Sequence, residues 1–187
     1  MAKVNYFTPR VAGFQLGATF APDSNDGGGR DSAADPLAAP FENVISVAGN
    51  WTGAFTGVDM TISATGIFGD AIAPGGDDLS DWSVGALLGF AGAHFGLNYA
   101  QRTDANEADI FAAGIRYGFG PVRASVGWIN FNPDVGTNQN VYIVSADMGI
   151  FPGVVLKGDI SYNDDNPRAL DGPDSTWGGV LSVQMNY

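Results

Sequence analysis

The chain contains one histidine and no cysteine, which limits the chemistry that its side chains can support. Nucleophilic catalysis needs a nucleophile beside a general base, and His94 is the only imidazole available for that role. No serine or aspartate adjoins His94 in the sequence, although Ser83 falls on the same face of the preceding segment. We therefore expect no enzymatic activity, no cofactor and no metal centre, since one imidazole would be joined only by oxygen ligands.

Acidic residues outnumber basic residues, 20 to 8, and they gather in polar stretches. Such carboxylates could filter ions or bridge divalent cations, but no cluster has the Asp spacing and closing Glu of a calcium loop. Solvated loop surface is the simpler interpretation. The formal charge of −12 also argues against a nucleic-acid partner. The clusters are Asp23, Asp26, Asp31 and Asp35; Asp77, Asp78 and Asp81; and Asp164, Asp165, Asp171 and Asp174.

Other charged residues alternate with apolar ones, which places them on one face of β-strands. In residues 93–102, for example, Phe95 and Leu97 would face one side while His94 and Arg102 face the other. About eleven segments of roughly ten residues show this alternation, separated by turn or loop residues. We predict that the charged residues on the polar face line a pore. They are Lys3, Asp59, His94, Arg102, Arg116, Arg123, Asp147, Lys157 and Asp159.

The composition agrees with strands that face lipid on one side. The mean hydropathy is +0.03 although 45% of the residues are hydrophobic, as expected when only every second residue meets lipid. The small, polar inner face lacks the bulky apolar filling of a small soluble barrel. The sequence therefore predicts an all-β, antiparallel transmembrane β-barrel with about ten or eleven strands in this chain, forming a single domain over residues 1–187.

Aromatic residues recur on the apolar face close to segment ends. A single one of them could be ordinary strand packing, but a set with consistent parity favours two girdles at the membrane–water interfaces. The predicted girdle residues are Trp51, Trp82, Phe90, Tyr99, Phe119, Trp128, Tyr142, Tyr162, Trp177 and Tyr187.

Short and long connections alternate along the chain. Short turns on the periplasmic side and longer loops on the extracellular side are typical of outer-membrane barrels. The predicted short connections are residues 9–13, 52–57, 91–92, 120–121 and 151–153. The longer, acidic ones are residues 21–43, 69–79, 103–107, 132–139 and 164–174.

Residues 6–17, with the sequence YFTPRVAGFQLG, and the following Ala21-Pro22-Asp23 resemble the strand, turn and strand element of the Gram-negative porin family, in its proteobacterial branch. Tyr187 is similar to the aromatic C-terminus of that family. The resemblance implies a general-diffusion porin of the bacterial outer membrane with about sixteen strands and a constriction loop. It also implies a homotrimer in outer-membrane lipid, and basic wall residues that oppose acids on that loop.

The strand count departs from this family. If Tyr187 ends a sixteenth strand, the segments here correspond to strands six to sixteen, so we expect an N-terminally truncated barrel. An odd number of strands would also make the first and last strands parallel. Either ten strands close without the first segment, or the wall is incomplete, because an unpaired strand edge is not stable in lipid.

Two functions are consistent with these patterns. The leading hypothesis is a water-filled channel for passive diffusion of small hydrophilic solutes and ions, with a tendency toward cations that follows from the negative charge. The alternative is a narrow structural or surface-interaction barrel whose lumen is filled by side chains. Small inner residues favour open space, although narrow barrels also need them.

Overall fold

The structure is a computed structural model that describes residues 3–23, 41–72, 74–103, 107–136, 138–165 and 175–185. Within these residues the chain forms eleven β-strands, and no helix is long and apolar enough to cross a membrane. The predicted number of segments is confirmed. The strands are β1 (Val4–Phe7), β2 (Phe14–Asp23), β3 (Phe41–Phe55), β4 (Val58–Ala71), β5 (Leu79–Phe90), β6 (Ala93–Arg102), β7 (Ala108–Phe119), β8 (Val122–Pro133), β9 (Gln139–Phe151), β10 (Val154–Asp165) and β11 (Thr176–Met185).

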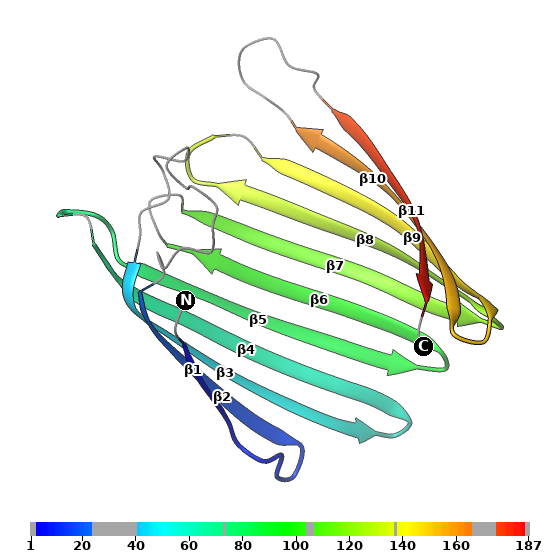
Figure 1. Cartoon of the computed structure of the whole chain (residues 1–187), viewed down its shortest axis with the longest axis horizontal. Helices are drawn as coiled ribbons and strands as arrows, with labels where there is room; N and C mark the ends of the chain where they lie inside the picture. The colour runs from blue at the N-terminus through cyan, green and yellow to red at the C-terminus, as the bar shows by residue number, and fades with distance from the viewer. Residues whose placement is uncertain are drawn as a thin grey trace.

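All eleven strands form one antiparallel sheet in sequence order. The sheet curls into an open trough with β1 and β11 at its two edges (Figure 1). Because successive strands alternate in direction, β1 and β11 run the same way. Within the described residues β1 pairs with β2 and neither edge pairs with the other. The ten-strand closure considered from the sequence is therefore not observed.

Two-residue turns close hairpins at one end of the sheet, called here the turn end. Thr56 and Gly57 have φ angles of 51° and 81°, and Ala91 and Gly92 have 50° and 81°. Two successive positive φ angles are typical of the type I′ turn, whose twist matches that of the paired strands. Glycine adopts this conformation without a steric penalty, which explains its place at the second position of both turns.

The predicted connection at residues 52–57 is wrong in extent. β3 continues through Phe55, which pairs with Val58, and Thr52 pairs with Thr61 on β4. Only Thr56 and Gly57 form the turn, because cross-strand pairing extends through residues that the sequence pattern had given to the turn.

The longer connections lie at the opposite end of the sheet, called here the loop end. Strand pairing extends into several of them, since β4 reaches Ala71 and β8 reaches Pro133. Parts of all five predicted loops lie outside the described residues, as do Asp26, Asp31, Asp35, Asp171, Asp174 and Tyr187.

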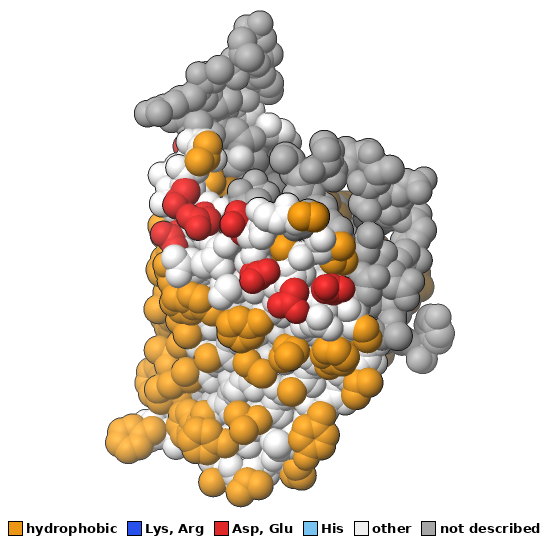
Figure 2. Space-filling model, turned by 90° about the vertical axis from the view of Figure 1, so that its left-hand side faces the viewer, with side chains coloured by type: hydrophobic (Ala, Val, Ile, Leu, Met, Phe, Trp, Pro, Cys, Tyr) orange, Lys and Arg blue, Asp and Glu red, His pale blue; other side chains and the backbone are white. Residues whose placement is uncertain are grey.

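The sheet has no dry core like that of a soluble domain. Among the described residues, Ala21 and Ala108 are the only buried hydrophobic residues. Large apolar side chains are instead exposed on successive strands, with exposed fractions of 53% for Leu97, 54% for Val144 and 57% for Ile160. An apolar surface this extensive requires an apolar environment or a partner to cover it. Figure 2 shows apolar side chains over the lower part of one side and acidic side chains above them.

Candidate functional site: the polar face and the aromatic belts

Charged side chains on the polar face of the sheet form a row across neighbouring strands. Residues that pair directly across antiparallel strands have Cβ atoms about 4.5–5.5 Å apart, so each member of the row neighbours the next. The row brings His94 and Arg116 side by side near its centre, with an acid toward each end. From β4 to β10 it consists of Asp59, Gly89, His94, Arg116, Ser125, Ser145 and Asp159.

A second row lies next to the first, toward the turn end. Arg123, Asp147 and Lys157 are direct neighbours on β8, β9 and β10, so the charge alternates in sign from strand to strand. Arg123 Nε lies 2.7 Å from Asp147 Oδ1, and their side chains are 55% and 26% exposed. Because this ion pair is largely solvated, its attraction is screened, and the two charges remain accessible to solutes.

Two predicted wall residues lie apart from these rows. Arg102 ends β6 at the loop end, on the same strand face as His94 by alternation. Lys3 is exposed and directly precedes β1 at the loop end of that edge strand. The structure thus groups seven of the nine predicted residues into two rows and leaves Lys3 and Arg102 outside them.

Arg10 lies between β1 and β2 and is not among the predicted wall or girdle residues. Its guanidinium donates hydrogen bonds to four neutral acceptors that connect this turn with β2 and β3. Arg10 belongs to the family-like segment of residues 6–17, but nothing in that segment indicates these bonds, because the acceptors are 3 to 42 positions away in the sequence. The acceptors are Gly13 O (2.6 Å), Thr52 Oγ1 (2.9 Å), Gln15 Oε1 (3.0 Å) and Asn50 Oδ1 (2.6 Å).

The structure offers no catalytic pairing of His94 with Ser83. Ser83 pairs with Ala100, whereas His94 pairs with Gly89, six residues further along β5. At about 3.4 Å per residue, the two positions are separated by about 20 Å along the strand. That separation excludes hydrogen bonding between a serine nucleophile and a histidine base at these positions.

An aromatic belt crosses the apolar face near the loop end. Rings on adjacent strands touch: Trp82 lies 5.3 Å from Tyr99 and Tyr162 lies 4.7 Å from Trp177, measured between ring centroids. The belt also contains Phe20, Phe68 and Phe111, which lie on the apolar face by alternation but are not among the predicted girdle residues. The full set is Phe20, Phe68, Trp82, Tyr99, Phe111, Trp128, Tyr142, Tyr162 and Trp177.

Polar tips of this belt donate hydrogen bonds to side chains at the same level of the sheet or nearer the loop end. Such rings have an apolar body on the side of the hydrophobic band and a polar atom on the side of the acidic loops, as is typical of residues at a membrane–water boundary. The bonds run from Trp82 Nε1 to Gln101 Oε1 (3.0 Å), from the Tyr99 hydroxyl to Asp109 Oδ1 (2.7 Å) and from Trp128 Nε1 to Asn140 Oδ1 (3.0 Å).

Three other predicted girdle residues lie near the turn end. Phe90 and Phe119 are the last residues of β5 and β7. Trp51 on β3 lies against Phe14 of β2, with ring centroids 6.4 Å apart. The apolar face is therefore bounded by aromatic residues toward both ends of the strands.

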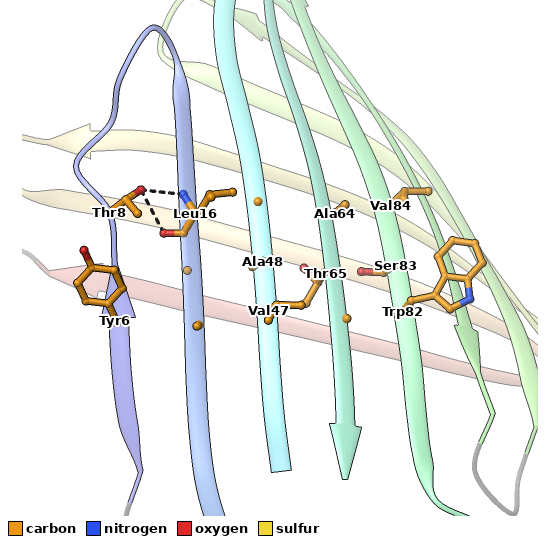
Figure 3. A pocket seen from close by; sticks show the side chains of 14 residues that line it. Tyr6, Thr8, Leu16, Val47, Ala48, Ala64, Thr65, Trp82, Ser83 and Val84 are labelled. Carbon is orange, nitrogen blue, oxygen red and sulfur yellow. Dashed lines mark hydrogen bonds between the residues drawn. The ribbon is translucent and has the colours of Figure 1, made fainter. Parts of the chain in front are cut away.

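Between these aromatic residues, the outer face of β1–β5 carries a shallow groove of about 680 Å³. Tyr6, Leu16, Trp82 and Val84 border it, as Figure 3 shows, and several of its lining residues are glycine or alanine. The side chain of Thr8 supports its β1 side, since the Leu16 amide donates to Thr8 Oγ1 at 3.0 Å.

Acidic residues also meet at the loop end. The side chains of Glu107 and Asp134 are hydrogen-bonded to each other, and the Asp134 amide donates to the Glu107 carbonyl at 2.9 Å. The pKa of Glu107 is raised above its ordinary value of 4.5, and this side-chain bond is the largest cause. Repulsion from the Asp134 charge is the second cause. In the described part of the chain, no three histidine or acidic side chains are grouped so that they could hold a metal ion.

Comparison with known proteins identifies the family. The family model for Gram-negative porins matches residues 1–186. The chain belongs to the Gram-negative porin family. This membership, together with the sheet and its aromatic belts, places the porin in the bacterial outer membrane. The predicted antiparallel β-barrel fold and the predicted family are confirmed. A search of curated protein sequences gave no significant match.

Solved structures share the fold of this porin at low sequence identity. The anion-selective porin from Comamonas acidovorans is 14% identical with a TM-score of 0.62, and the alignment covers 98% of this chain and 57% of that one. A mutant of Rh. blastica porin is 18% identical with a TM-score of 0.60, covering 99% and 54%. The KdgM porin is 10% identical with a TM-score of 0.51, covering 99% and 91%. The chain thus spans little more than half the length of the first two proteins.

Proposed function

We propose that the polar face of this porin lines a water-filled channel for passive diffusion of small hydrophilic solutes and ions. The observation that carries this proposal is the division of one sheet into two faces. One face presents rows of charged residues, including His94, Arg116 and the ion pair of Arg123 with Asp147. The other is apolar and bounded by aromatic residues, as expected of a surface in lipid.

The side-chain-filled lumen is less consistent with the polar face. In the row next to the charged one, toward the loop end, Gly96, Gly114 and Gly127 are direct neighbours on β6, β7 and β8. Three adjacent residues without side chains leave space at the middle of the wall. We therefore propose an open channel, and not a plugged structural barrel, as the function of the complete wall.

Charge could influence ion preference in two opposing ways. Acidic residues at the loop end, such as Asp77, Asp78 and Glu107, would concentrate cations at that mouth. Basic wall residues such as Arg116 and Lys157 would attract anions further inside. One structural neighbour is an anion-selective porin by name. We propose a cation preference at low salt that weakens as salt screens the loop charges.

Further features of the family are also proposals for this chain. We propose that it assembles as a homotrimer in outer-membrane lipid and that residues 1–187 form one barrel domain. The exposed apolar side chains of the outer face support contact with lipid or with neighbouring subunits. Cross-linking of the protein in outer-membrane vesicles, followed by electrophoresis without heating, would separate a trimer from a monomer.

Conductance in a planar lipid bilayer tests the channel directly. We expect stable steps from the purified, folded porin, with a reversal potential in a salt gradient that reports ion preference. Ser145 and Val144 provide a matched pair, since they are consecutive on β9 and lie on opposite faces. A water-soluble thiol reagent should reduce the conductance of Ser145→Cys and leave that of Val144→Cys unchanged. Folded protein without conductance, or equal effects on both variants, would contradict the proposal.

A further inference from the structure

The polar face contains an open hollow of about 390 Å³ near its centre. Its floor is formed by Gly96, Gly114 and Gly127, which are direct cross-strand neighbours. Leu87 on β5 and Ile143 on β9 continue the same row on either side of the glycines. With strands about 4.8 Å apart, Leu87 and Ile143 are about 19 Å apart across the strands. The hollow is therefore a backbone floor between two apolar side chains.

The charged row borders this hollow on the side of the turn end. His94 and Arg116 both line it, and each lies two residues from a floor glycine on its own strand. Within the described residues neither side chain has a hydrogen-bond or ion-pair partner, whereas Arg123 is paired with Asp147. No described residue occupies the donors of the Arg116 guanidinium, which lies at the edge of an apolar, flat-floored space.

We propose that this hollow binds small aromatic monocarboxylates, a proposal that rests on the polar face being accessible to solutes from the channel. The flat ring would lie on the peptide planes of Gly114 and Gly127, between Leu87 and Ile143. The carboxylate would accept hydrogen bonds from Arg116, whose planar guanidinium suits bidentate contact with a carboxylate. His94 would contribute an N–H donor from the adjacent strand.

The reach of Arg116 and the chemistry of the hollow both favour this ligand class. Arg116 is two residues from Gly114, which corresponds to about 6.8 Å along the strand. The arginine side chain is long enough to cross this distance and to reach a carboxylate attached to a ring over the floor. A cation would be repelled by Arg116. A compact inorganic anion could contact Arg116 but would gain nothing from Leu87, Ile143 and the glycine floor.

Benzoate is the probe, and binding is measured by saturation-transfer NMR and titration on the whole porin folded in detergent. Acetate keeps the charge without the ring, and benzyl alcohol keeps the ring without the charge. We expect benzoate to bind at least about tenfold more tightly than either, because each lacks one of the two contacts.

Two pairs of variants assign the binding to the hollow. Arg116→Gln should weaken benzoate binding about tenfold, whereas Arg123→Gln, which removes the same charge from an existing ion pair, should change it less than about twofold. Gly127→Leu should abolish binding by filling the floor. A Cβ at Gly127 meets nothing nearer than 3.8 Å and one at Gly149 meets nothing within 4 Å, so Gly149→Leu is a control of equal added volume.

The outcomes separate this inference from the channel proposal. Benzoate binding with the expected variant effects would support the hollow even if the bilayer stayed silent, and only the channel would then fail. Conductance without preferential benzoate binding, or binding unaffected by Arg116→Gln and Gly127→Leu, would overturn the inference and leave the channel standing. Absence of both conductance and binding would refute both.

Discussion

Arg10 should stabilise the β1–β2–β3 region more than an ordinary surface arginine does. The change to test is Arg10→Ala, which removes four hydrogen bonds to neutral acceptors on the first turn, β2 and β3. A hydrogen bond to a charged group contributes about 1.5–3 kcal/mol, but these acceptors are exposed and water can replace the guanidinium. We therefore expect the free energy of unfolding to fall by about 1–3 kcal/mol in total.

Arg123→Ala is the matched control, since it removes the same side chain from a solvated ion pair on the polar face. Exposed pairs of this kind contribute about 0.2–1 kcal/mol. Unfolding by urea in lipid vesicles, under reversible conditions, would measure both variants. In a background that keeps Trp51 as the single tryptophan, fluorescence reports on the region around Arg10, because Thr52 follows Trp51 and accepts one of the Arg10 bonds. A loss from Arg123→Ala equal to or larger than that from Arg10→Ala would refute this reasoning.

Three further predictions follow from the two faces, the loop end and the turns. Val144→Lys places a charge on the apolar face and should cost about 2–4 kcal/mol in lipid, whereas Ser145→Lys on the polar face should cost less than about 1 kcal/mol; equal losses in vesicle unfolding would contradict the assignment of faces. The raised pKa of Glu107 means that folding favours its protonated form. The free energy of unfolding that Glu107 contributes is therefore fully present below the ordinary glutamate pKa of 4.5 and is lost as pH rises through the raised pKa. The urea midpoint of unfolding should fall as pH rises through this range in the native porin, and it should fall less in Glu107→Gln. If the midpoint of Glu107→Gln depends on pH as strongly as that of the native porin, the contact of Glu107 with Asp134 is not the cause of the pH dependence. Thr56→Asn should stabilise the porin by about 0.5 kcal/mol, because asparagine tolerates the φ of 51° better than a β-branched residue; a lower urea midpoint would show that the threonine is not strained.

Alternation predicted the faces of the strands because side chains in a strand have a period of two. That rule assigned Trp82 and Tyr99 to the apolar face and His94 and Arg116 to the polar face without knowledge of any contact. It could not predict that His94 and Arg116 are neighbours, because alternation fixes the side of a residue and leaves the register between strands open. Register is set by turns, and the turn at Thr56 and Gly57 lacks the Asn-Gly or Asp-Gly pair that usually marks its position.

The role of Arg10 depends on a different kind of information. Its acceptors at Asn50 and Thr52 belong to β3, which is separated from β2 by a long connection. Neither spacing nor composition links these positions. Only the pairing of β2 with β3, which sets Gln15 opposite Asn50, brings the acceptors within reach of one guanidinium.

The path of the loop-end aromatic belt sets the inclination of the strands in the membrane. From Phe68 on β4 to Trp177 on β11, the belt steps toward the turn end by two residues at three places, between β4 and β5, β5 and β6, and β7 and β8. Six residues correspond to about 20 Å along the strands, and seven strand intervals to about 34 Å across them. If the belt keeps a constant depth at the lipid surface, the strands lean about 30° from the membrane normal. A strand of 12 residues such as β8 would then rise about 35 Å, slightly more than the hydrocarbon thickness that it must cross.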